Sequence, residues 1–150
     1  NSTVKNVQRI ASELRPSMLD DLGLAPAIEW YCGEFEKRTG VECRTDLEEI
    51  QSEDPHQNLT IFRILQEALT NVIRHARAKM VMIKLSRVDE DITLEIKDDG
   101  IGTGQDKINS RESLGFIGMR ERTNQFNGRL EIFSPRKKGT TVKISFPIHT

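Results

Sequence analysis

Cysteine is scarce in this sequence, and so are aromatic residues, long apolar runs and any excess of charge of one sign. Cys32 and Cys43 have no C-x-x-C spacing and no histidine cluster beside them, so we expect neither a disulfide scaffold nor a zinc site, and a reduced cytoplasmic setting fits. No apolar run approaches the length of a membrane span and no signal-peptide pattern opens the chain, so no direct membrane contact is expected. A net charge of −1 gives no overall attraction to nucleic acid.

The composition is otherwise that of an ordinary globular protein. Hydrophobic residues make up 36% of the 150 positions and charged residues 30%, which suits one domain with one buried core. Apolar residues from Val4 to Met18 follow the 3-4 spacing of a helix that packs on a partner helix, and Pro16 interrupts this pattern. Because the chain opens inside the pattern without a methionine, we expect a fragment of a longer protein.

Helical and strand-like segments alternate along the rest of the chain. Gly40 is a helix stop, Asp54 followed by Pro55 is a helix start, and Asn127 with Gly128 is a second stop. We therefore expect an α+β fold, a two-layer α/β sandwich with a mixed sheet packed on about three helices. The expected helices cover residues 27–38, 55–76 and 114–126, and the expected strands cover residues 41–47, 79–88, 91–98, 129–134 and 140–148.

The helix expected at residues 55–76 carries a polar stripe. Glu67, Asn71 and His75 are spaced four residues apart on a helix whose other face consists of core residues. The side-chain oxygen of the asparagine is a suitable ligand for Mg²⁺, and the glutamate could orient a metal-bound water or take a proton. A solvent-facing helix with i,i+4 side-chain pairs would show the same pattern.

Three glycine-containing motifs follow this helix. In DDGIG, from Asp98 to Gly102, the glycines would admit a flat ligand close to the main chain, and Asp98 would accept a hydrogen bond from an exocyclic amine. In SLGFIGMRER, Gly115 and Gly118 open a helix whose free N–H groups could bind phosphate. In KGTTVKISFP, Thr140 begins a strand after a tight turn. Each motif alone is weak, because surface turns and ordinary strands often produce it.

Taken together, the order and spacing of these parts resemble the histidine-kinase-type ATPase superfamily, which includes gyrase-type topoisomerases, mismatch-repair ATPases and a heat-shock chaperone. The resemblance covers about residues 25–147. LRPSMLDDLGLAPAIEW, ALTNVIRHARA and GFIGMRER also resemble the sensor histidine kinase subfamily whose signature ends in L-R-P-x-x-L-x-x-L-G-L. This resemblance implies that residues 1–24 are the end of a dimerisation helix with its linker and that residues 25–150 are a catalytic ATP-binding domain.

The resemblance also implies a role for each residue of the motifs. Asn71 would hold the Mg²⁺ that bridges the ATP phosphates, and Glu67 would be the catalytic base in relatives that need one. The other assigned residues are Arg74 and His75 beside the phosphate tail, Asp98 on the adenine amino group with Thr140 in support, Gly100 and Gly102 in the base pocket, and Gly115 and Gly118 as anchors of the lid. Ser113 departs from the family pattern, which has glycine there, and this puts the details of lid closure in question.

The implied activity is transfer of the ATP γ-phosphoryl group to a histidine on the dimerisation helix, for relay to an aspartate of a response regulator. The implied parent is a homodimer whose acceptor histidine lies outside this chain, since none of its three histidines has the helix-seam context of an acceptor. An ATP-hydrolysing switch or an anti-sigma serine kinase of the same fold would have no reason to carry the L-R-P junction. A structural module with an inactive nucleotide site would be expected to have lost Asn71 or Asp98.

Overall fold

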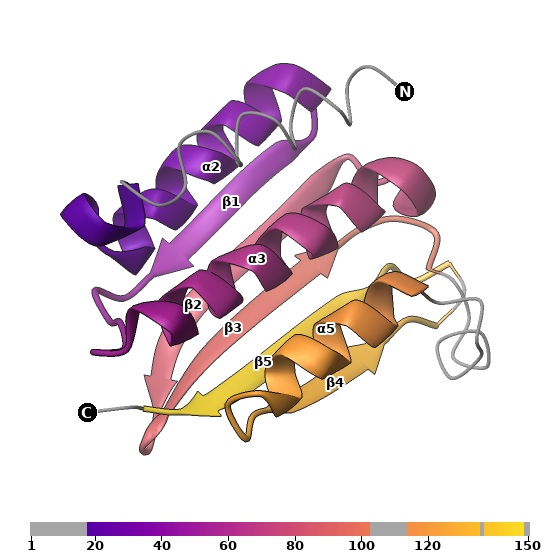
Figure 1. The fold of residues 1–150 in the computed structure, drawn as a ribbon. Coiled ribbons are helices and arrows are strands. Elements are labelled where there is room, and N and C mark those ends of the chain that lie inside the picture. Colours follow the sequence, from indigo (N-terminus) through magenta and orange to yellow (C-terminus); the bar gives the residue numbers. More distant parts are fainter. Residues whose placement is uncertain (1–17, 103–113, 136, 149–150) are drawn as a thin grey trace.

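Two layers make up the fold in the computed structural model, which describes residues 18–102, 114–135 and 137–148. One layer is a five-stranded sheet, and the other consists of three helices that cover one face of that sheet (Figure 1). The helices are α2 (Leu24–Thr39), α3 (Pro55–Asn71), which continues as a π-helical turn η1 (Val72–Ala76), and α5 (Leu114–Asn124). The strands are β1 (Glu42–Leu47), β2 (Met80–Val88), β3 (Asp91–Asp98), β4 (Arg129–Phe133) and β5 (Thr141–Pro147).

The sheet is mixed, with the strand order β1-β2-β3-β5-β4. β1 pairs with β2 in parallel, and the three other pairs are antiparallel. A parallel pair needs a crossover connection, and α3 supplies it between β1 and β2. The predicted fold class, an α+β two-layer sandwich with a mixed sheet, is confirmed.

The core lies between the sheet and the helices. Strand residues alternate between the two faces of a sheet, and in the central strands every second residue is apolar and buried. From the helix layer, Ile61, Leu65 and Leu69 of α3 have no exposed surface, and the ring of Tyr31 in α2 packs edge-on against Phe62 at 5.6 Å. The sheet contributes Val81, Ile83, Leu85, Ile92, Leu94, Ile96, Val142, Ile144 and Phe146.

The other face of the sheet carries a row of charges that alternate in sign from one strand to the next. The strand registers place Asp46 of β1 beside Lys84 of β2, Lys84 opposite Glu95 of β3, Glu95 opposite Lys143 of β5, and Lys143 opposite Glu131 of β4. Opposite charges on neighbouring strands support the pairing of a sheet. This face therefore suits water rather than a second apolar layer.

Local signals in the sequence explain where the helices begin and end. The side chain of Asp54 accepts a hydrogen bond from the backbone N–H of His56 at 2.9 Å, and Pro55 occupies the first turn of α3. Gly40 adopts φ 77°, and its N–H donates to the carbonyl of Glu36 at 2.9 Å, so that it closes α2. Both predicted helix boundaries are confirmed, although α2 begins at Leu24 and not at Ala27.

The segment before α2 belongs to the same core as far as it is described. Residues 18–22 are helical, and Leu19 and Leu24 are 9% and 1% exposed. The division predicted between residues 24 and 25 stays a prediction, since residues 1–17 lie outside the described part of the chain. In the described residues no helix is long and apolar enough to cross a membrane.

Candidate functional site

The predicted site residues gather at one end of the molecule. Figure 1 shows that the C-terminal ends of α3 and β3 and the first residues of α5 and β5 lie on the same side. Asn71 and Asp98 are the last residues of α3 and β3, Gly115 is the second residue of α5, and Thr140 directly precedes β5. The sheet register accounts for one of these meetings, because the antiparallel pairing of β3 with β5 brings the end of one strand to the start of the other.

Asp98 is the centre of the arrangement at the end of β3. It is 6% exposed, and its Oδ1 accepts hydrogen bonds from the backbone N–H groups of Gly100, at 2.8 Å, and Thr140, at 3.3 Å. The structure gives its Oδ2 no hydrogen-bond partner among the described residues. One oxygen is therefore held by the protein, and the other can accept a hydrogen bond from a ligand.

Burial is the main influence on the Asp98 carboxyl group and raises its pKa above the ordinary value of 3.8. The neighbouring Asp99 raises the pKa further, while the N–H groups of Gly100 and Thr140 act against both. Raised pKa values in buried carboxyl groups are common at functional sites, and structural networks also produce them.

Two glycines allow the Asp98 loop and the turn before β5 to lie against each other. Gly102 has φ 69° and Gly139 has φ 77°, a region that favours glycine. A side chain on Gly102 would collide with the carbonyl oxygen of Pro135, and one on Gly139 would collide with the carbonyl oxygen of Asp98. Gly102 was predicted as a site residue, whereas Gly139 was not, although the tight turn that contains it was recognised.

Thr140 contributes to this contact with its backbone and its side chain. Its carbonyl accepts from the N–H of Asp98 at 2.9 Å, and its hydroxyl lies 2.6 Å from the hydroxyl of Ser134. Ser134 is fully buried and was not predicted as a site residue. The link between Ser134 and Thr140 joins the residue after β4 to the residue before β5, and so supports Thr140, whose backbone contacts Asp98.

Asp99 fastens the same loop to the neighbouring strand. Its Oδ1 accepts from the backbone N–H groups of Lys79, at 2.8 Å, and Met80, at 3.0 Å. These two hydrogen bonds hold the pKa of the Asp99 carboxyl group below its ordinary value of 3.8, and the one from Met80 has the larger effect. The two adjacent aspartates thus have pKa shifts of opposite direction. Sequence analysis quoted Asp99 within the motif but gave it no role.

The polar stripe lies at the C-terminal end of α3, where the helix changes its winding. An uninterrupted helix was expected as far as Ala76, whereas the structure has an α-helix to Asn71 and a π-helical turn from there to Ala76. Arg77, with φ 52°, ends that turn. Single π-helical turns occur often at functional sites. No residue type marks so short a turn, so the sequence pattern could not distinguish it from α-helix.

The members of the stripe differ in their surroundings. Asn71 is half-buried and Arg74 is exposed, and neither has a hydrogen-bond partner in the part of the chain that the structure describes. The backbone of His75 lies in the π-helical turn, while its side chain is outside the described part. The role of Asn71 as a ligand for Mg²⁺ stays a prediction.

The carboxylate of Glu67 lies against α5. Its Oε1 accepts from Nε of Arg122 at 3.2 Å, and its Oε2 is buried with no partner within the described residues. Gly118 lies against this carboxylate, because a Cβ added there would be 3.5 Å from Oε2. Arg122 was not predicted, although its position one turn after Gly118 places it on the same helix face.

The glycines predicted as anchors of a lid both belong to α5. Gly115 and Gly118 are its second and fifth residues. Residues 103–113, which include the departure at Ser113, lie outside the described part, so the prediction about lid closure is not tested by the structure. Gly100 is buried beside Asp98, and its role in a base pocket stays a prediction.

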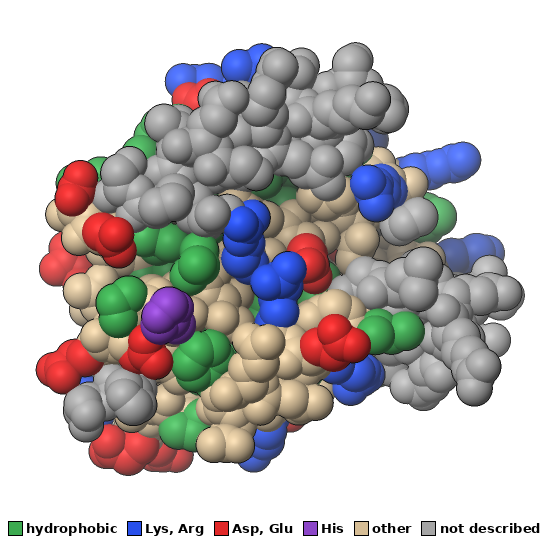
Figure 2. Space-filling view, viewed as in Figure 1, with side chains coloured by type: hydrophobic (Ala, Val, Ile, Leu, Met, Phe, Trp, Pro, Cys, Tyr) green, Lys and Arg blue, Asp and Glu red, His purple; other side chains and the backbone are tan. Residues whose placement is uncertain are grey.

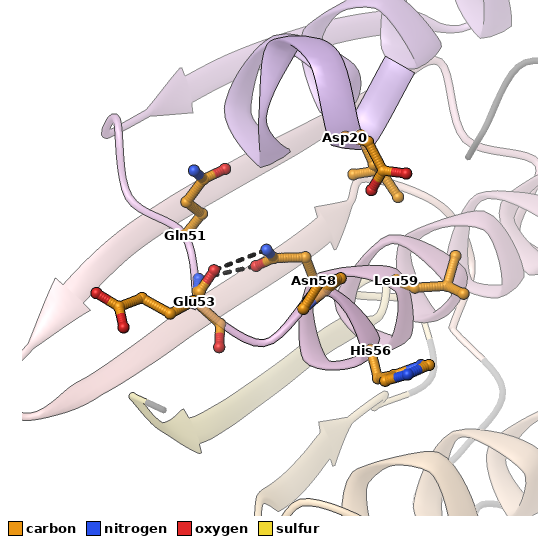
Figure 3. A pocket seen from close by; sticks show the side chains of 9 residues that line it. Asp20, Gln51, Glu53, His56, Asn58 and Leu59 are labelled. Carbon is orange, nitrogen blue, oxygen red and sulfur yellow. Dashed lines mark hydrogen bonds between the residues drawn. The ribbon is translucent and has the colours of Figure 1, made fainter. Parts of the chain in front are cut away.

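The surface around these elements is mixed in charge. Figure 2 shows both basic and acidic side chains on the helix-covered face. A hollow of about 660 Å³ lies at the other end of α3, where Asp20, Gln51, Glu53, His56 and Leu59 surround it (Figure 3). Asn58 braces the hollow by two hydrogen bonds of 2.8 Å with the backbone of Ser52. Since α3 has 17 residues and is therefore roughly 25 Å long, this hollow and Asn71 lie at opposite ends of the helix.

The sequence and the structure both match known proteins. Residues 56–150 match the family model described as histidine kinase-, DNA gyrase B-, and HSP90-like ATPase. The signal transduction histidine-protein kinase/phosphatase DegS of Brevibacillus brevis is 39% identical over 99% of this chain and 39% of its own length. The oxygen sensor histidine kinase NreB of Staphylococcus carnosus is 34% identical over 97% of this chain and 42% of its own length.

A solved structure shows the same fold. The histidine kinase domain of the blue-light activated histidine kinase from Erythrobacter litoralis EL346 superposes with a TM-score of 0.72 and 19% identity, over 83% of this chain and 65% of that one. The chain spans 39% and 42% of the length of the two curated relatives, so it corresponds to one part of such proteins. It belongs to the family of histidine kinase-, DNA gyrase B- and HSP90-like ATPases.

Proposed function

We propose that this domain binds ATP with Mg²⁺ and transfers the γ-phosphoryl group to a histidine on the dimerisation segment of its own parent protein. The phosphoryl group then passes to an aspartate of a response regulator. The parent acts as a homodimer with its catalytic part in the cytoplasm. The observation that carries the proposal is the buried Asp98 carboxylate, which has one oxygen fixed by backbone N–H groups and the other free of partners among the described residues.

The Asp98 carboxylate explains how the base would be chosen. The free oxygen accepts the amino group of adenine, whereas guanine presents a carbonyl at that position, so two acceptors would face each other. Gly102 and Gly139 let the Asp98 loop and the turn before β5 lie against each other, which supports the carboxylate at the end of β3. The hydrogen bond between the hydroxyl groups of Thr140 and Ser134 supports the segment that lies beside the carboxylate.

The phosphates would lie towards the end of α3 and the start of α5. The C-terminal end of a helix carries partial negative charge, so anionic phosphates beside α3 need cations to offset it. Arg74 is exposed there and supplies one. The N-terminal end of α5 faces the same side (Figure 1). A helix N-terminus carries partial positive charge and suits phosphate, because its first N–H groups have no partner within the helix.

The donors in the described residues suit Mg²⁺ at this place. No group of three His, Cys, Asp or Glu side chains in that part of the chain could form a metal site without a ligand. Mg²⁺ commonly binds one or two protein oxygens and completes its shell with phosphates and water, and the unpaired Asn71 amide oxygen fits that need. When bound, the ion would neutralise charge on the phosphoryl oxygens.

The chemistry asks the protein mainly for positioning. Phosphoryl transfer has a loose transition state, and a neutral imidazole nitrogen attacks with its own lone pair. Asp98 and the glycines hold the nucleotide by its base, and Asn71 and Arg74 hold the other end. The γ-phosphoryl group then faces the acceptor histidine of the dimerisation segment.

The test is incubation of this chain with radiolabelled ATP, alone and with the dimerisation segment of its parent. We expect ATP binding without stable self-labelling, and slow labelling of the added segment. Transfer between separate chains lacks the effective concentration of a tethered acceptor, commonly on the order of millimolar. The product should be acid-labile and base-stable, as a phosphoramidate is. Stable labelling on Ser or Thr would favour a serine kinase. Phosphate release at the same rate with and without the segment would favour a plain ATPase.

A further inference from the structure

The ion pair between Glu67 and Arg122 joins α3, the helix that carries the polar stripe, to α5. The two residues are separated by 55 positions in the sequence and meet across α3 and α5 at 3.2 Å. Gly118, one turn before Arg122, has no side chain to keep the carboxylate away. The pair is therefore built from both helices, and its existence depends on how α5 sits against α3.

The contact does not serve stability well. The two side chains are 40% and 32% exposed, and ion pairs with that much solvent contact contribute little to folding. Meanwhile Oε2 of Glu67 is buried without a partner in the described part of the chain, which is unfavourable for a carboxylate. Since stability does not explain why Glu67 is held in this position on the polar stripe, we look for a functional reason.

The functional reason concerns water. A carboxylate near the γ-phosphoryl group can take a proton from a water molecule, whose oxygen then forms a bond to the γ-phosphorus. The bond from that phosphorus to the bridging oxygen breaks, ADP leaves with the electron pair, and the γ-phosphoryl group is released as inorganic phosphate. A histidine acceptor does not need this base, because its ring nitrogen attacks directly. A histidine kinase therefore gains if its carboxylate is turned away from water.

We propose that Arg122 is a positioning residue that decides between acceptors: it holds Glu67 against α5 and so suppresses ATP hydrolysis in favour of transfer to histidine. This inference rests on the proposed function. It adds a residue outside the predicted site and a reason for the orientation of Glu67. It also ties hydrolysis to the position of α5, since a shift of that helix would release the carboxylate.

The test compares two arginines on the same helix. Arg122→Gln removes the ion pair, and Arg120→Gln removes the same charge two residues earlier, from an exposed side chain without an ion pair to any described residue. Phosphate release, labelling of the added dimerisation segment and ATP affinity are measured for both. We expect Arg122→Gln to raise the ratio of hydrolysis to transfer at least about tenfold with little change in ATP affinity. Arg120→Gln should behave as the unaltered chain.

Two further variants keep the result interpretable. Arg122→Lys retains a positive charge and should restore most of the original ratio. Adding Glu67→Gln to Arg122→Gln should abolish the extra hydrolysis, because the carboxylate would no longer be there to take the proton. An unchanged ratio in Arg122→Gln, an equal loss of both activities, or extra hydrolysis that persists without the carboxylate would overturn the inference. Failure of the unaltered chain to bind ATP or to label the segment would instead overturn the proposed function.

Discussion

Asp98 and Thr140 are joined by two hydrogen bonds, one between backbone groups and one to the Asp98 carboxylate. The N–H of Asp98 donates to the Thr140 carbonyl at 2.9 Å, and the N–H of Thr140 donates to Oδ1 of Asp98 at 3.3 Å. The position of the carboxylate is thus set by a residue 42 positions later in the chain. Any change that separates β3 from the turn before β5 will move the carboxylate, even where Asp98 itself is unchanged.

The first prediction concerns Asp98→Asn, which we expect to remove most ATP binding and leave the fold intact. The asparagine oxygen can still accept the two backbone N–H groups, which leaves its NH₂ group where adenine also presents a donor. A buried polar group without a partner costs about 1–3 kcal/mol, roughly 5- to 150-fold in affinity. Calorimetry with ATP and GTP checks this. Equal affinity of the unaltered chain for the two nucleotides would contradict the assignment of Asp98.

The second prediction concerns Asn71→Ala, which should lower phosphoryl transfer on the order of 100-fold while ATP affinity changes much less. The amide oxygen would hold the ion that offsets charge on the transferring group, whereas the base is held at Asp98. Transfer rate and nucleotide affinity are measured with and without Mg²⁺. Asn124→Ala, at an exposed position of α5, is the matched control. Full Mg²⁺-dependent transfer by Asn71→Ala would show that the stripe has another role.

The third prediction compares two glycines. Gly139→Ala should destabilise the fold by more than about 1 kcal/mol and weaken ATP binding, since the new methyl group meets the Asp98 carbonyl at a positive φ. Gly33→Ala, in the interior of α2 with nothing within 4 Å, should instead stabilise by about 0.5 to 1 kcal/mol. Chemical denaturation measures both. Normal ATP affinity in a folded Gly139→Ala variant would argue against this turn as a wall of the base pocket.

The fourth prediction uses the opposite pKa shifts of Asp98 and Asp99. Because the pKa of Asp98 is raised in the folded state, its ionisation costs stability as pH rises from 3.8 through the higher folded value. Over that range the free energy of unfolding of Asp98→Asn should rise relative to that of the unaltered chain. The lowered pKa of Asp99 contributes stability above pH 3.8 that is lost as pH falls through the folded value. The free energy of unfolding of Asp99→Asn should therefore fall relative to that of the unaltered chain as pH rises. Urea denaturation between acidic and neutral pH checks the two trends. Parallel trends would contradict the different surroundings of the two carboxylates.

Sequence reasoning succeeded where the cause is local and missed what depends on distant segments. The start of α3 was predictable because Asp54 and Pro55 act within one turn. The motifs that contain Asp98 and Thr140 were also recognised, but the hydrogen bonds between them follow from the register of β3 with β5. The contact of Glu67 with Arg122 could not be foreseen either, because it requires the placement of α5 on α3.

The alternating charges on the open face of the sheet have a consequence for how the chain finds its strand register during folding. A slip of two residues keeps every side chain on its proper face, so burial alone does not oppose it. In each antiparallel pair, one such slip brings two cations opposite each other: Lys84 with Lys97 between β2 and β3, Lys97 with Lys143 between β3 and β5, and Lys143 with Arg129 between β5 and β4. Repulsion between like charges disfavours these misaligned sheets. The charges on the open face thus favour the strand register that places Asp98 next to Thr140.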